Sequence, residues 1–109
     1  MATKVFEEKS VTLFSGKEVK LRPLKISVLR HFMKRFEDLG AVSEDNDGSF
    51  DVLVDCIAIA MRQYDPALSD EHKDGKAKLE DELDMPTAYK IIEVAAGIKL
   101  GDDEDPKGL

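Results

Sequence analysis

The sequence predicts a small α+β domain, mostly α, in which an N-terminal β-hairpin is followed by three or four helices. Three observations indicate this class. Apolar and polar residues alternate near the N-terminus, which is the period of a strand with one buried face. Apolar residues further along recur at helical spacing, and Pro or Gly separates the segments. The length of 109 residues fits one domain, placed at 1–100, with an acidic flexible tail at 101–109.

The hairpin prediction rests on the stretch VTLFSGKEVKL. Residues that oppose one another in a sheet share a face, so the two apolar sets match when the loop has an odd number of residues. A three-residue loop, FSG, with Gly16 in the left-handed conformation meets this condition. It pairs Leu13 with Lys17. Val11 is then expected opposite Val19.

The next segment, ISVLRHFMKRFEDLG, has large apolar residues at helical spacing from Leu29 to Leu39. Ser27 is the predicted N-cap and Gly40 the predicted end of this helix. We expect the apolar stripe to pack in the core of the domain.

The segment SFDVLVDCIAIAMRQYDP predicts a second helix that starts at Ser49 and ends before Pro66. It is apolar nearly all round, which is typical of a helix buried in its own domain or against a partner. A domain of this size has few elements with which to cover every face. We therefore expect this helix to be central, with part of its surface completing an interface. Cys56 lies within it and is expected to be a buried, inert thiol.

Two further helices are expected after the second. The first is short and runs from about Lys76 to Leu83. The other lies in DMPTAYKIIEVAAGIKL, with Asp84 or Met85 as its cap and Gly97 at its end.

The net charge of −7 is distributed unevenly. Residues 1–36 hold nine basic and three acidic residues, whereas 37–109 hold seven basic and twenty acidic ones. An acidic chain argues against nucleic-acid binding. The opposite charges can attract within a monomer or between copies, and head-to-tail contacts between copies generate rings or open helices. One cysteine, no long apolar run and no signal-peptide pattern predict a cytoplasmic protein with no membrane partner.

The acidic stretch SEDNDGSFDVLV, from Ser43 to Val54, has acids at alternating positions around Gly48, as calcium loops do. With Gly48 at the sixth position, however, Val54 occupies the twelfth, where a calcium loop needs a bidentate carboxylate. We interpret the stretch as an acidic connector. A calcium-binding regulatory module stays open as the least favoured alternative.

No catalytic constellation is found in the sequence. It has no glycine-rich phosphate loop, and no serine has a His–acid partner in a motif setting. His72 lacks a second His or Cys nearby, so no metal site is predicted, and His31 is expected on the surface. We therefore expect a protein that is not an enzyme, needs no cofactor or metal, and works through its surfaces.

The stretch VTLFSGKEVKLRPLKISVLRHFMKRF resembles the opening of tail assembly chaperones of long-tailed (siphovirus-type) bacteriophages. These proteins begin with a strand, a Ser-Gly-Lys turn, a second strand that runs into Arg-Pro-Leu, and an amphipathic helix. The later stretches YDPALSDE and LEDELDMPTAYKIIEVAAGI are also similar to the family pattern. The resemblance spans about residues 10–100, and the HKDGKAK stretch departs from the more regular acidic helix of the family.

The resemblance implies a chaperone that binds and solubilises the tape measure protein and helps to recruit tail tube subunits. It would act in the cytoplasm of the infected bacterial host, as a homo-oligomer, and be absent from the mature virion. A structural tail-completion or connector protein of the virion is the alternative. The candidate contacts to a partner or to another copy are Phe32, Met33, Phe36, Ile57, Ile59 and Met61.

Overall fold

The computed structural model describes residues 9–42 and 44–98, so the predicted tail at 101–109 lies outside the described residues. The described chain forms a two-stranded antiparallel hairpin followed by four α-helices and two 3-10 segments, which confirms the predicted fold class. The elements in chain order are β1 (Lys9–Thr12), β2 (Glu18–Leu21), α1 (Ile26–Phe36), η1 (Glu37–Val42), α2 (Asn46–Tyr64), η2 (Pro66–Leu68), α3 (Gly75–Glu82) and α4 (Met85–Ala96).

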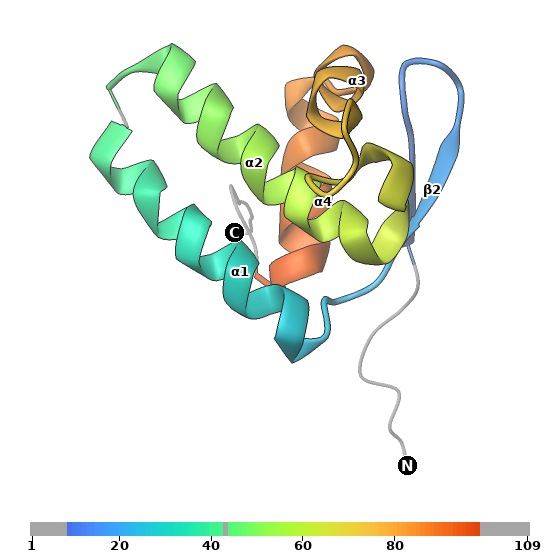
Figure 1. Ribbon diagram of the computed structural model, residues 1–109, viewed down its shortest axis with the longest axis horizontal. Helices are drawn as coiled ribbons and strands as arrows, with labels where there is room; N and C mark the ends of the chain where they lie inside the picture. Colours follow the sequence, from blue (N-terminus) through green and yellow to red (C-terminus); the bar gives the residue numbers. More distant parts are fainter. Residues whose placement is uncertain (1–8, 43, 99–109) are drawn as a thin grey trace, which may run out of the picture.

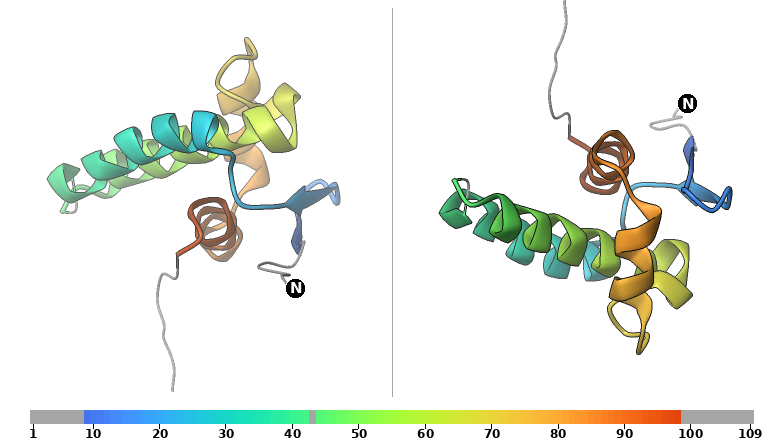
Figure 2. Two further views of the ribbon diagram at one scale, coloured as in Figure 1. Left: turned by 90° about the horizontal axis from the view of Figure 1, so that it is seen from below. Right: turned by 90° about the horizontal axis from the view of Figure 1, so that it is seen from above.

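Helix α2 lies at the centre of the fold, as predicted, and packs against α1, α3 and α4. Helices α1 and α2 run antiparallel, side by side (Figure 1). Figure 2 shows these two helices as one layer, with α4 and the hairpin together on one side of that layer. The hairpin packs against α4, and β2 also contacts α2. None of the described helices is long and apolar enough to cross a membrane.

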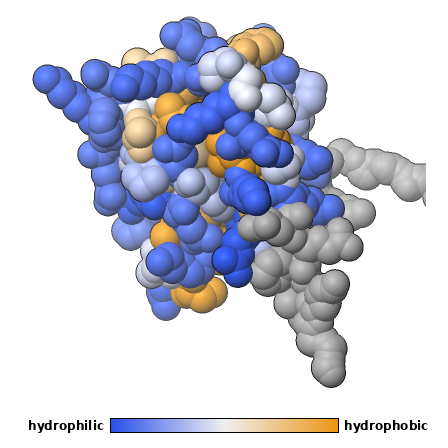
Figure 3. All heavy atoms as spheres, turned by 90° about the vertical axis from the view of Figure 1, so that its right-hand side faces the viewer, coloured by the Kyte–Doolittle hydropathy of each residue, from blue (hydrophilic) through white to orange (hydrophobic). Residues whose placement is uncertain are grey.

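The hairpin has the predicted register. Val11 pairs with Val19, and the backbone N–H of Leu13 donates to the carbonyl of Lys17 at 2.8 Å. Gly16 has a φ of 95°, the left-handed conformation that the three-residue loop requires. The apolar face of the hairpin is buried. The side of the molecule where the hairpin lies is mostly hydrophilic, with hydrophobic atoms visible in several places between polar side chains (Figure 3).

The predicted boundaries of α1 were wrong at both ends. Lys25 is the N-cap, and its carbonyl accepts hydrogen bonds from the first turn, so Ser27 is already helical. At the other end, Phe36 is followed directly by η1, which contains Gly40. Gly40 does not have a positive φ, so it does not form a left-handed cap.

The predicted start of α2 was also wrong. The helix begins at Asn46 with Asp45 as N-cap, and the backbone N–H of Ser49 donates to the carbonyl of Asp45 at 2.8 Å. The Ser49 hydroxyl donates instead to the carbonyl of Val42 at 2.8 Å. Ser49 therefore ties the first turn of α2 to the end of η1.

The caps of α4 are those predicted. The carboxylate of Asp84 accepts a hydrogen bond of 2.9 Å from the backbone N–H of Thr87, and Gly97 ends the helix with a φ of 71°. Pro86 lies in the first turn, where its missing N–H has no cost. These local signals determine where α4 starts and ends along the chain.

The middle of α2 is covered by the chain itself, since every residue of 56–61 is buried. Among the described residues, three ion pairs join the basic segment 1–36 to the acidic remainder: Lys17 binds Asp65, and Arg35 binds Asp38 and Asp55, each at 2.8 Å. Some of the attraction between the oppositely charged parts of the sequence is therefore used within one monomer.

Candidate functional site

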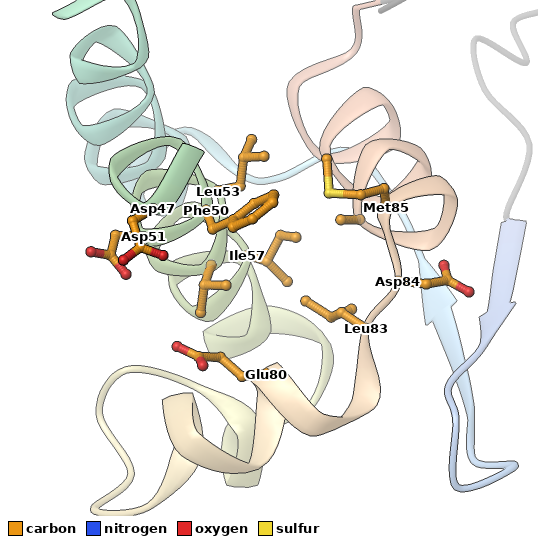
Figure 4. Close-up of a pocket in the computed structure, with 11 residues that line it drawn as sticks. Asp47, Phe50, Asp51, Leu53, Ile57, Glu80, Leu83, Asp84 and Met85 are labelled. Carbon is orange, nitrogen blue, oxygen red and sulfur yellow. The ribbon is translucent and has the colours of Figure 1, made fainter. Parts of the chain in front are cut away.

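An open groove lies between α2, the end of α3 and the start of α4 (Figure 4). Its volume is about 330 Å³. We call it the α2–α4 groove. Its lining residues are Asp47, Phe50, Asp51, Leu53, Val54, Ile57, Glu80, Leu83, Asp84, Met85 and Ala88.

The base of the groove is apolar and closed. Leu53, Ile57 and Ala88 are buried and belong to the main core. Phe50 lies one turn before Leu53 on the same face of α2, because residues three and four apart on a helix are neighbours. Its side chain stands beside the groove in Figure 4 and is 48% exposed, so apolar surface is open to solvent there.

The opposite wall comes from the junction of α3 and α4. Leu83 follows α3, Met85 is the first residue of α4, and both are half-buried. The position of α3 depends on Gly75, because a Cβ built there would lie 2.0 Å from the carbonyl oxygen of Ser69. This close backbone approach brings the end of α3 to the groove.

Carboxylates border the apolar base. Asp47 and Asp51 lie one turn apart on α2, Glu80 comes from α3, and all three are exposed. Asp84 is engaged as the cap of α4, and the hydrogen bond from Thr87 lowers the pKa of its carboxyl group. The lining contains no Lys, Arg or His residue.

The chemistry of this site suits binding. Its polar groups are solvent-exposed carboxylates, and its lining holds no Ser, Cys or His that could act as a nucleophile or base. Cys56 lies nearby in α2 but is buried, with its Sγ 3.8 Å from the carbonyl oxygen of Phe32. Burial raises the pKa of the Cys56 thiol to about 12, so it is protonated at neutral pH.

The structure places the six predicted contact residues mainly inside the domain. Phe32, Ile57, Ile59 and Met61 are buried, and among them Ile57 lines the base of the α2–α4 groove. Met33 and Phe36 are half-buried on α1 and do not line the groove. The ring of Phe36 stacks on Phe32 with centroids 6.0 Å apart. Packing within the monomer thus accounts for most of this set.

Sequence reasoning missed Phe50, Leu83 and Met85 as surface residues. One signal for Phe50 was available, since a large aromatic residue stands between Asp47 and Asp51 in the first turns of an otherwise buried helix. The exposure of Met85 depends on how α4 crosses α2, which no local pattern reports.

The acidic stretch from 43 to 54 does not form a calcium loop over its described part. Residues 46–54 are helical, so their carboxylates follow the helix surface and do not wrap around one point. Within 9–42 and 44–98, no group of three or more His, Cys, Asp or Glu residues could hold a metal ion. The calcium-binding alternative therefore has no site in the described chain.

No protein-family model matches this chain. Comparison with curated proteins finds no match either. Comparison with solved structures also finds none.

Proposed function

We propose that this protein is a non-enzymatic tail assembly chaperone of a long-tailed bacteriophage, which binds the tape measure protein and keeps it soluble. The observation that carries the proposal is the α2–α4 groove, which exposes an apolar surface on a domain whose core is closed. The similarity of residues 10–100 to that family supports it. Recruitment of tail tube subunits, in the cytoplasm of the infected host, belongs to the same proposal.

The groove matches the way proteins bind helical segments. An amphipathic helix buries its apolar stripe in a hydrophobic groove and keeps its polar face in water. A volume of about 330 Å³ accommodates a few large side chains of such a stripe. Each copy would cover a short segment of a long client, so many copies would be needed along its length.

Co-expression with the tape measure protein encoded by the neighbouring genes tests this function. We expect the two proteins to co-purify, and the tape measure protein to be less soluble without its partner. Phe50→Ser should reduce co-purification because it removes the exposed apolar wall of the groove. Phe14→Ser is the matched control, since Phe14 is 71% exposed at the hairpin tip and does not line the groove. A tape measure protein that is equally soluble alone and never co-purifies would refute the proposal.

Self-association is the second part of the proposal. The excess of basic residues in 1–36 and of acidic residues in 37–109 favours head-to-tail contacts between copies. Light scattering should detect an oligomer at low salt that dissociates at high salt. A monomer at every protein and salt concentration would contradict this part. Mass spectrometry of purified particles separates the chaperone from a structural virion component, because a chaperone should be absent from the mature virion.

A further inference from the structure

We propose that the α2–α4 groove selects amphipathic helices that carry Lys or Arg beside their apolar stripe. This inference rests on the proposed function, because it assigns the chemistry of the segment that the same site binds. The described groove combines an apolar base with a rim of one charge sign, and both features are seen in Figure 4.

Three carboxylates at the rim are available to a bound helix. Asp47 and Asp51 lie together on α2, and Glu80 faces them from α3 (Figure 4). Asp84 points away from this group and caps α4 through Thr87. The rim therefore presents negative charge mainly on the α2–α3 side.

Two basic side chains share a neighbouring hollow with Asp51 and Glu80 but are already paired. Arg35 and Lys76 both bind the carboxylate of Asp55, on the neighbouring face of α2. Within the described residues, Asp47, Asp51 and Glu80 form no ion pair. A basic side chain from outside the monomer can therefore pair with them without displacing an existing partner.

The spacing of the rim fits a helical ligand. Asp47 and Asp51 lie about 6 Å apart along α2, which is one helical turn. Two basic residues four apart on a bound helix have the same spacing, so they can face both carboxylates while the apolar stripe contacts Phe50 and Met85. An acidic helix in the same pose would place like charges together, which opposes binding.

A second copy of this chain is the competing occupant. The outer side of α1 presents Arg30 and Lys34 one turn apart, but it offers a single large apolar residue, Ile26, which is 63% exposed. One apolar side chain fills little of a groove of about 330 Å³. The observations thus favour a separate client helix with a full apolar stripe.

Two synthetic amphipathic peptides test whether the groove prefers basic helices. Both carry the same apolar stripe, which is flanked by Lys in the first peptide and by Glu in the second. Fluorescence anisotropy with the full chain should show about tenfold tighter binding of the Lys peptide at about 20 mM salt, and at most about twofold at about 500 mM. The double variant Asp47→Asn, Asp51→Asn should lose this preference. The control is Glu37→Gln with Asp74→Asn, which removes equal charge from exposed residues outside the groove.

Each other result overturns the inference. Equal binding of both peptides, with both weakened by Phe50→Ser, would leave the groove as the client site and refute its charge selectivity. Equal loss of preference in both double variants would attribute the effect to net charge. If neither peptide binds, the inference is also refuted. A concentration-dependent dimer that disappears in the Asp47→Asn, Asp51→Asn variant would refute it as well, because a second copy would then occupy the groove. None of these outcomes depends on the tape measure protein, so failure of the proposed function is recognised separately.

Discussion

Replacing Gly75 with alanine is expected to lower the free energy of unfolding by about 2 kcal/mol. Gly75 is buried at the start of α3, and a Cβ there would lie 2.0 Å from the carbonyl oxygen of Ser69. The carbonyl carbons of Leu68 and Ser69 would lie 3.0 Å from the same Cβ. All these neighbours are backbone atoms, so no side-chain rotation relieves the clash. Helix α3 and the loop must separate by about 1.4 Å, because ordinary van der Waals contact starts at 3.4 Å.

The expected loss of about 2 kcal/mol follows from the contacts that this separation weakens. Overpacking of a tight site costs about 1–3 kcal/mol. Separation also disturbs the packing of Leu79, which is fully buried on α3. The higher helix propensity of alanine returns at most about 1 kcal/mol. A net loss of about 2 kcal/mol corresponds to a fall in Tm of about 10 °C for a domain of this size.

Urea and thermal unfolding followed by circular dichroism measure this loss. Gly40→Ala is the matched control, because a Cβ at Gly40 would meet no atom within 4 Å and the residue does not have a positive φ. We expect the control to be neutral or slightly more stable. Equal stability of Gly75→Ala and the wild type would refute the argument that backbone contact with Ser69 holds α3 in place.

Three further changes test other parts of the fold. Arg62 donates two hydrogen bonds of 2.7 Å to Asp70, and these lower the pKa of the Asp70 carboxyl group from its ordinary value of 3.8. The pair therefore stabilises the protein fully above pH 3.8, and this stabilisation is lost as the pH falls through the lowered pKa. Asp70→Asn should lower the free energy of unfolding by at most about 1 kcal/mol at neutral pH, because solvent screens the pair. Urea titrations should show that this difference vanishes in acid. A difference that does not change with pH would contradict the stabilising role of the Arg62–Asp70 pair. Cys56, whose pKa burial raises to about 12, should react with a thiol reagent far more slowly in the native protein than in guanidinium, and rapid native labelling would show that the α1–α2 contact opens. Gly97→Ala should cost about 1 kcal/mol in thermal unfolding, because the φ of 71° is strained for alanine, and no change would mean that α4 does not need this cap.

The hairpin and α4 were predictable because their signals are local. Alternation and loop length together specify the pairing of Val11 with Val19, and one carboxylate and one glycine mark the ends of α4. The starts of α1 and α2 were not predictable from their serines. Ser27 and Ser49 both lie inside the first turn of their helices, and the Ser49 hydroxyl donates to the preceding segment η1 in place of the expected cap.

The extent to which the chain buries α2 could not be predicted from the number of large apolar residues in the sequence. The stretch after α2 has few large apolar residues, yet Leu68 and Leu79 are both buried. Part of the cover is backbone, since the N–H of Asp70 donates to the carbonyl of Ala58 at 3.2 Å. Ala58 is small, and Gly75 allows the loop and α3 to approach closely. A count of side chains therefore underestimates how well this chain covers its own central helix.

This coverage determines where a partner can bind without unfolding the domain. The hairpin and the α3 loop cover the C-terminal half of α2, and the exposed apolar surface remains at its N-terminal half, around Phe50. Because Phe50 is half-exposed while Ile57 is fully buried, truncation of Phe50 removes contact surface at little cost in stability, whereas truncation of Ile57 creates a cavity. Binding and folding are thus separable at Phe50 and coupled at Ile57. A partner that binds the folded domain is therefore expected to contact Phe50 and not Ile57.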